Sequence, residues 1–358
     1  MRTLVLHDVH EKHGAKLGAR GDAEIVLGYG ALADEWRALQ GTAVLVDRSH
    51  RALLAVAGPE SRLYLHGMVT NEVKALKAGQ GNHAAVITAR GKMLGDGRVI
   101  VRENDELLLD LDPEAHAPTF EHLDQFLISE DCTLHDLTGR LAVFGVYGPV
   151  AATVIAAATG EAPPQLPLHH HVDRAFVDAP AMLLAASPAG VAGYEVWVPA
   201  PAAEAAWSAL LAAVRQVGGL PAGDDVLEAA RVHHAVPRYA ADMDETTIPL
   251  EANLEDAISY TKGCYVGQEV IAKATYRGQV RRKLAQMAVP AGTLPGAALV
   301  EGDKSVGTVT SVLDPDPAGG PPLALGYVRR DRLALGTRLA IEGGGQAEIT
   351  WVPPAKEE

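Results

Sequence analysis

The chain has 358 residues, of which 48% are hydrophobic, and it carries a formal net charge of -14 at pH 7. This length exceeds what one hydrophobic core normally supports, so we expect two or three compact units. Nucleic acid is excluded as a partner, because a phosphate backbone would repel an acidic protein and only 5% of the residues are aromatic and able to stack on bases.

The cysteine content and the apolar patterning indicate the compartment. The chain has two cysteines, Cys132 and Cys264, which cannot form a disulfide framework and point to a reducing compartment. A secretory signal would have a basic start followed by an apolar run, whereas residues 1–20 are polar and rich in His. Because Pro, Glu or Arg interrupts every Ala-rich segment, we expect no membrane span. The expectation is a cytoplasmic monomer without a membrane partner.

The first half of the chain mixes predicted helices with predicted strands. We predict helices over residues 31–39, 59–72, 114–128 and 149–158, and strands over 43–49, 52–56, 83–88, 98–101, 106–111 and 141–146. Pro59 suits a first helical position. The proline-rich stretch 162–167 predicts a connection between two lobes.

The second half predicts another lobe and then a change of pattern. Strands are predicted over 171–176, 181–186 and 194–198, followed by a helix over 201–217 that Gly218 and Gly219 end. From residue 282 onward only short strands follow, over 284–289, 305–313, 323–328, 338–341 and 347–352. We therefore expect a main region over 1–283, with lobes of roughly 1–160 and 161–283 that can be discontinuous, and a small β-module over 284–358.

Residues 262–269, which read KGCYVGQE, place Cys264 between the glycines Gly263 and Gly267, with Lys262 two positions before it. Cations and unpaired backbone N–H groups stabilise a thiolate, so this setting predicts a reactive thiol with Lys262 beside it. The alternative is that Cys264 packs as a small apolar residue.

The surroundings of this motif are basic although the whole chain is acidic. Against the single acid Glu269, the segment 262–283 contains Lys262, Lys273, Arg277, Arg281, Arg282 and Lys283. Arginine forks and lysine ammonium groups bind carboxylates and phosphates, so the run predicts an anionic ligand. A solvated, charged strand is the alternative.

Two other features bear on a possible site. Three consecutive histidines at 169–171 invite a metal interpretation, but neighbouring side chains of an extended segment point to opposite faces, so we expect no metal site. Asp96 lies in the glycine-spaced turn GKMLGDG, where a loop would present its carboxylate. A simple turn-forming role for Asp96 is the alternative.

The order of several short motifs resembles the glycine cleavage T-protein (aminomethyltransferase) family over nearly the full length. The matching segments are VDRS at 46–49, GPE at 58–60, MVTNEV at 68–73, GKM at 91–93, GYEV at 193–196, RVHHAVPRY at 231–239, PLEA at 249–252, GTVTS at 307–311 and ALGYV at 324–328. Within that superfamily, KGCYVGQE resembles the signature of the YgfZ-type tetrahydrofolate-binding proteins, which are linked to iron–sulfur cluster assembly or repair.

This resemblance implies an α+β fold in which two intertwined lobes enclose a central channel and a C-terminal β-barrel covers one side. It also implies tetrahydrofolate in the channel, with the pteridine held by a carboxylate and the glutamate tail met by basic residues. The strongest positional matches for these roles are Glu195 and Arg231. The remaining matches for folate binding are Met68, Asn71, Asp96 and Tyr239.

The function that the resemblance implies is a tetrahydrofolate-binding protein that supports iron–sulfur client or assembly proteins through Cys264, with Lys262 favouring its thiolate. One alternative is a folate-dependent aminomethyltransferase or demethylase, and another is a thiol-redox protein without folate affinity. Two departures from the T-protein pattern disfavour aminomethyl transfer. Gly95 precedes Asp96 where that family has two adjacent Asp residues, and His83 stands where Tyr is common.

Overall fold

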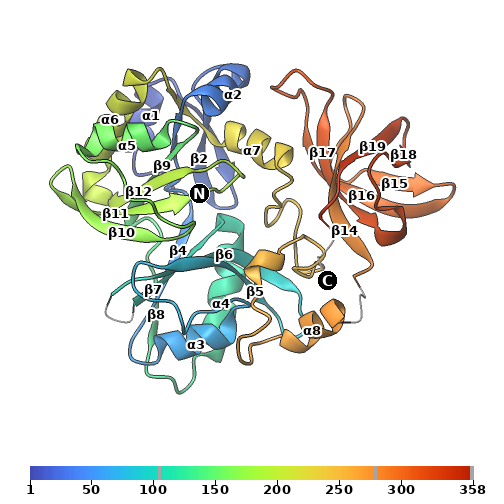
Figure 1. The fold of residues 1–358 in the computed structure, drawn as a ribbon, viewed down its shortest axis with the longest axis horizontal. Helices are drawn as coiled ribbons and strands as arrows, with labels where there is room; N and C mark the ends of the chain where they lie inside the picture. Colours follow the sequence, from blue (N-terminus) through green and yellow to red (C-terminus); the bar gives the residue numbers. More distant parts are fainter. Residues whose placement is uncertain (104–105, 277–279, 355–358) are drawn as a thin grey trace.

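The chain folds into two open β-sheets, each covered by helices, and a closed β-barrel (Figure 1). This computed structural model describes residues 1–103, 106–276 and 280–354. The mixed α/β architecture with a C-terminal barrel confirms the fold class that the sequence predicts. None of the described helices is both long and apolar enough to cross a membrane.

The lower lobe in Figure 1 contains a five-stranded antiparallel sheet in the order β5-β6-β7-β4-β8. Its strands are β4 (Ala52–Ala57), β5 (Gly81–Ile87), β6 (Met93–Val101), β7 (Glu106–Leu111) and β8 (Thr133–Asp136). Helices α3 (Ser61–Met68) and α4 (His116–Phe126) bury their apolar faces in the core of this sheet. The distant helix α8 (Gln268–Tyr276) joins the same core through Ile271 and Ala274. The short turn η1 (Pro113–Ala115) contacts α4 and β6, and η3 (Glu255–Ala257) contacts β5.

The upper lobe contains a six-stranded sheet in the order β10-β11-β12-β9-β3-β13. Its strands are β3 (Val44–Asp47), β9 (Leu141–Tyr147), β10 (His171–Phe176), β11 (Ala179–Ala186), β12 (Gly193–Pro199) and β13 (Leu220–Ala222). One face packs on the apolar stripe of α6 (Ala203–Gln216), where Trp207 and Leu210 are fully buried, and on α5 (Ala151–Thr159). Around this sheet lie α1 (His7–Lys12), the hairpin β1 (Lys16–Arg20) and β2 (Ala23–Gly28), α2 (Leu32–Gly41), η2 (Ala200–Ala202) and α7 (Asp224–His233).

The two lobes are intertwined because the chain passes between their sheets twice. Residues 48–51 lead from β3 of the upper sheet to β4 of the lower sheet, and the segment after β8 leads back to β9. A strand that enters a new sheet brings the residues at its end to the junction of the lobes. Charged residues in the short 48–51 connection are therefore placed between the two sheets.

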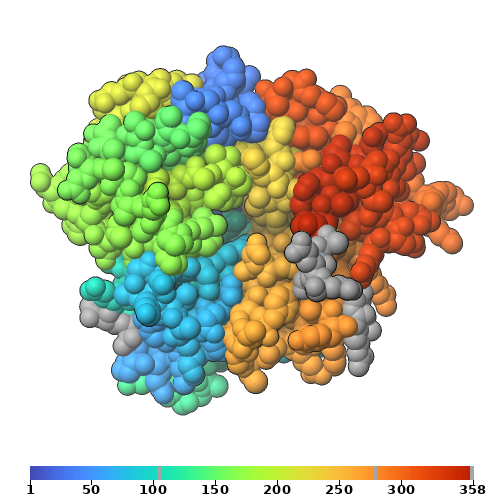
Figure 2. All heavy atoms as spheres, in the orientation of Figure 1, coloured from blue at the N-terminus to red at the C-terminus, as the bar shows by residue number. Residues whose placement is uncertain are grey.

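The C-terminal region is a closed six-stranded barrel in the order β14-β17-β16-β15-β18-β19. Its strands are β14 (Arg282–Ala288), β15 (Ala298–Glu301), β16 (Lys304–Leu313), β17 (Leu323–Arg329), β18 (Arg338–Ile341) and β19 (Gln346–Trp351), with η4 (Arg330–Arg332) after β17. Alternating apolar residues such as Ala285 and Met287 of β14 fill its interior. The yellow segment that contains α7 lies between the upper lobe and the barrel (Figure 2).

Some element predictions were wrong for identifiable reasons. The helix predicted through residue 72 ends at Met68, because Val69 is extended and the backbone N–H of Thr70 donates to Ala85 of β5. The charged strand considered for the basic run is also wrong where α8 forms a helix. Helix α7 was missed, although Asp224 and Asp225 in its first turn are a helix-start signal.

Candidate functional site

A cavity of about 280 Å³ lies where the two sheets and α7 meet. Its wall carries six arginines, namely Arg20, Arg48, Arg51, Arg98, Arg231 and Arg238. The same wall carries five acids, namely Asp96, Asp112, Asp224, Glu228 and Asp256. His83, His169 and Ser187 complete its polar lining. A nearly balanced set of charges in a concave site suits a ligand with several polar groups rather than an apolar one.

Asp96 faces this cavity from β6 and is held by His83 of β5. In the antiparallel pairing Asp96 lies opposite Ala85, which puts it diagonally across from His83, and the His83 Nε2 to Asp96 Oδ2 distance is 2.8 Å. The Oδ1 atom of Asp96 is buried and has no hydrogen-bond partner among the described residues. A side chain at Gly95 would have no room, because a Cβ there would lie 2.7 Å from the Ala115 Cβ.

His169 lies on the other side of His83, with 6.4 Å between the ring centroids. Burial, followed by the charge of Arg98, lowers the pKa of His169 to about 3, so its ring is neutral at physiological pH. His171 of the same triplet is also buried, and burial lowers its pKa to about 4. Among the described residues the three-member group with metal-ligand spacing is His7, Asp8 and Glu11 on α1, where both acids are exposed.

Glu195 lies on β12 under the cavity and is fully buried. Its Oε1 atom accepts a hydrogen bond from the Tyr147 hydroxyl at 2.7 Å, and its Oε2 atom accepts from Arg98 at 2.7 Å and from the Trp197 indole at 3.0 Å. Burial alone would raise the pKa of Glu195, but the charges of Arg98 and Arg48 outweigh burial and lower it. Both carboxylate oxygens of Glu195, which was predicted to hold the pteridine, thus already accept hydrogen bonds from within the chain.

Arg98 of β6 also joins the two lobes. Its Nε atom donates to Asp110 of β7 at 2.6 Å, while its terminal nitrogen reaches Glu195 in the other sheet. Arg51 donates to Asp110 at 2.6 Å and to Asp112 at 2.7 Å, and Arg20 donates to Asp112 at 3.1 Å. This network of buried ion pairs forms one wall of the cavity, and each carboxylate in it has a cation partner.

Arg231 on α7 lines the cavity, but its guanidinium is fully engaged. It donates to both carboxylate oxygens of Glu228, to Asp242 at 2.7 Å, to the carbonyl of Val236 and to the hydroxyl of Ser311 in β16. A guanidinium has five N–H donors, so none remains for a ligand in this arrangement. Arg231 therefore ties α7 to the barrel.

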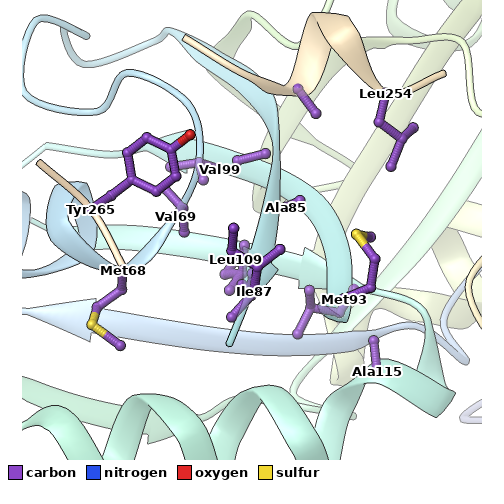
Figure 3. Packing of buried hydrophobic residues seen from close by; sticks show 14 of the residues in the cluster. Met68, Val69, Ala85, Ile87, Met93, Val99, Leu109, Ala115, Leu254 and Tyr265 are labelled. Carbon is purple, nitrogen blue, oxygen red and sulfur yellow. The ribbon is translucent and has the colours of Figure 1, made fainter. Parts of the chain in front are cut away.

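Three other predicted folate residues do not line the cavity. Met68 is buried in the lower-lobe core together with Val69 and Tyr265 (Figure 3). Asn71 donates to the carbonyls of His83 at 2.8 Å and Asp256 at 2.9 Å, which positions two segments that line the cavity. Tyr239 belongs to the lower-lobe core, and burial raises its pKa to about 12.

The KGCYVGQE loop is pinned to the lower lobe by the buried ammonium group of Lys262. Its Nζ atom donates to the carbonyls of His66 at 2.5 Å, Val69 at 2.7 Å and Asn71 at 2.8 Å, and lies 4.9 Å from the Tyr265 ring centroid. Burial lowers the pKa of Lys262 to about 8. All three of its N–H donors hold the end of α3 and the following turn, so its effect on the thiol stays a prediction.

Cys264 is exposed on this loop and does not line the cavity. The loop turns at Gly267, whose φ is +79° and whose Cβ would lie 2.4 Å from the carbonyl oxygen of Thr88. A non-glycine residue there would be strained and would also clash with backbone. The loop thus presents the thiol to solvent from a rigid base, with Tyr265 buried beneath it.

The basic run that contains this loop does not form one anion site among the described residues. Lys273 pairs with Glu269 at 2.6 Å, and β14 contributes Lys283 to an ion pair with Glu255 at 2.5 Å. Arg277 of the predicted cluster lies outside the described residues.

The arginines that do gather at the cavity come from sequence positions far apart, and sequence reasoning missed Arg20, Arg48, Arg51 and Arg98. One signal was present, because Arg98 and Asp110 lie inside otherwise apolar strands. Charged residues are rarely fully buried unless they are paired. Isolated charges in buried strands therefore indicate an internal polar site.

Comparison with known proteins identifies the superfamily. The model of the GCVT N-terminal domain family matches residues 6–262. Aminomethyltransferases of Shouchella clausii and Rippkaea orientalis are each 27% identical to this chain, and each alignment covers 95% of this chain and 93% of the relative. The crystal structure of the glycine cleavage system aminomethyltransferase T from Bartonella henselae has a TM-score of 0.88 at 23% identity and covers 98% of this chain and 96% of that chain, so the two share a fold. By the family match, this chain belongs to the GCVT N-terminal domain family.

Proposed function

We propose that this protein binds tetrahydrofolate in the cavity between its lobes and supports iron–sulfur cluster assembly or repair through Cys264, as the YgfZ-type resemblance implies. Membership in the GCVT N-terminal domain family and the aminomethyltransferase relatives support the folate part of this proposal. The cavity supplies the mixture of carboxylates, guanidinium groups and imidazoles that a folate with a polar ring and an acidic tail requires.

The observation that carries the proposal is an exposed thiol on a pinned loop that lies outside the cavity wall. A protein partner can reach such a thiol while the cavity holds a small molecule. The thiolate can attack the outer sulfur of a partner's persulfide, which forms a persulfide on Cys264 and releases the partner's thiolate. It can also attack a partner's disulfide, which forms a mixed disulfide and releases the other thiolate. One cysteine alone does not provide the ligands that an iron–sulfur cluster requires.

Aminomethyl transfer is less well supported by the cavity. The carboxylate of Asp96 is already paired with His83, and Gly95 has no room for a second acid beside it. The site therefore offers fewer groups for moving a proton to or from a folate nitrogen than the paired acids of the T-protein pattern.

The first test is anaerobic titration calorimetry of the full chain with tetrahydrofolate. We expect saturable binding with a Kd near or below about 100 µM, and no detectable heat up to millimolar folate would reject the folate part. The second test is complementation of a deletion strain with the Cys264→Ser variant, followed by an assay of a [4Fe–4S] enzyme. We expect loss of complementation by Cys264→Ser and full complementation by Cys132→Ser. Full complementation by both variants would reject the thiol part.

A further inference from the structure

Arg48 and Arg238 are the two cavity arginines whose guanidinium groups make no hydrogen bond to a described residue. Arg238 lies between two acids, at 3.4 Å from Glu228 and 3.6 Å from Glu114. Arg48 has a single acid partner among the described residues.

Arg48 follows β3 directly, and its backbone is fixed by a hydrogen bond from its N–H to the carbonyl of Val143 in β9. Its side chain is 8% exposed and lines the cavity, and its nearest acid is Glu195, with 3.6 Å between Arg48 Nε and Glu195 Oε1. The Nε atom is buried without a partner.

A buried charged donor without an acceptor is costly, so proteins pair such groups with acids, water or ligands. Here the acid beside Arg48 already accepts three shorter hydrogen bonds, from Tyr147, Arg98 and Trp197. No described residue accepts a hydrogen bond from the two terminal nitrogens of Arg48, and its side chain lines the cavity. Arg231, which the sequence singled out for an acidic ligand, has no free donor.

We propose that Arg48 is the anion anchor of the cavity and binds a carboxylate group of the ligand through its two terminal nitrogens. The parallel N–H groups of a guanidinium match the two oxygens of a carboxylate. A singly charged carboxylate suits this wall better than a doubly charged phosphate, because five acids share the cavity with six arginines. This inference rests on the proposed function only in naming folate as the molecule that carries the carboxylate.

Three ligands separate the possible roles of Arg48 in the full-length protein. Tetrahydrofolate contains both the pteridine ring and the glutamate carboxylates. The ligand p-aminobenzoylglutamate contains the carboxylates without the pteridine ring, and tetrahydropterin contains the ring alone. We would measure the Kd of each ligand anaerobically for the unaltered protein, Arg48→Gln and Arg48→Lys. Arg215→Gln on α6 is the matched control, because it removes an exposed arginine that does not line this cavity.

We expect Arg48→Gln to weaken tetrahydrofolate and p-aminobenzoylglutamate at least tenfold and to leave tetrahydropterin unchanged. Arg48→Lys keeps the positive charge but lacks the two parallel N–H groups, so its affinity for these two ligands should lie between those of the unaltered protein and Arg48→Gln. This variant also shows whether Arg48→Gln loses affinity merely by misfolding. Unchanged affinities in Arg48→Gln would overturn the inference, as would an equal loss for tetrahydropterin. If the unaltered protein binds p-aminobenzoylglutamate through Arg48 but not tetrahydrofolate, the inference holds and the folate proposal fails.

Discussion

The cavity between the lobes and the KGCYVGQE loop show two different uses of positive charge. In the cavity, six arginines from distant parts of the chain gather around acids, and the guanidinium groups of Arg48 and Arg238 make no hydrogen bond to a described residue. In the loop, Lys262, the first residue of the basic run, donates all three of its N–H groups to backbone carbonyls. A dense basic run in sequence therefore did not mark the place where the structure offers free donors to an anion.

The same contrast separates Arg231 from Arg48 within one cavity wall. Arg231 uses all five of its donors to join α7, the following turn and the barrel. Arg48 is held through its backbone N–H, lines the cavity and makes no hydrogen bond to a described residue through its guanidinium. The comparison teaches that the hydrogen-bond partners of an arginine, rather than its position near a site, decide whether it can bind a ligand.

The largest expected effect comes from Arg231→Met. The change leaves the buried carboxylate of Asp242 without its cation, which typically lowers the free energy of unfolding by about 3–5 kcal/mol. Urea denaturation measures this loss, and Arg215→Met on the exposed face of α6 should stay within about 0.5 kcal/mol of the unaltered protein. A loss below about 1 kcal/mol would show that Arg231 is not the tie between α7 and the barrel.

Lys262→Met should have the next largest effect. It leaves three carbonyls at the end of α3 without their donor, and an unsatisfied buried acceptor costs about 1–3 kcal/mol. Denaturation gives the loss of stability, and hydrogen exchange should become faster in residues 262–269. Lys273→Met, which breaks only an exposed pair with Glu269, should cost less than about 0.5 kcal/mol. Equal losses in the free energy of unfolding for the two variants would show that the buried Lys262 contributes no more to stability than the exposed Lys273.

The pH dependence of stability should sharpen the description of the cavity. Burial, followed by the charge of Arg98, lowers the pKa of His169 from 6.5 to about 3. Between these pH values the unfolded chain binds a proton at His169 that the folded chain does not bind. The contribution of His169 to the free energy of unfolding is therefore fully present above pH 6.5 and declines as the pH falls. We expect it to decrease by about 1 kcal/mol between pH 6.5 and 5.5.

The check on this expectation is urea denaturation of His169→Asn across that pH range. Asn tolerates the left-handed backbone of this position, where φ is 67°. The unaltered protein should lose more stability than the variant as the pH falls. Parallel pH profiles for the two proteins would mean that His169 titrates normally in the folded state.

Cys264→Ser should have the smallest effect on stability. Because the thiol is exposed, we expect a change within about 0.5 kcal/mol and an unaltered Kd for tetrahydrofolate. Thiol labelling of the folded protein should be lost with Cys264→Ser and kept with Cys132→Ser, since Cys132 is partly buried and packs against the lower-lobe core. A weaker Kd for tetrahydrofolate in Cys264→Ser would show that the loop and the cavity are not separate sites.

Local patterns gave the secondary structure where apolar spacing was regular. The stripe that ends at Gly218 predicted α6, and the short strands after residue 282 predicted the barrel strands β14, β16, β17, β18 and β19. The patterns failed where contacts distant in sequence decided the conformation. Thr70 leaves the helix because its backbone bonds to β5, and no local signal contains that partner.

The sequence by itself determined the fold class of the chain and singled out the candidates Asp96 and Cys264, because composition, periodicity and short motifs are local properties. Only the tertiary structure decided which charged groups share a cavity and which of their hydrogen bonds are already made. Glu195, Arg231 and Lys262 were chosen by residue type and position, yet the polar groups of each are already hydrogen-bonded to partners from other elements. Each side chain has a fixed number of hydrogen-bond donors and acceptors, and the groups that use them come together only when the chain folds.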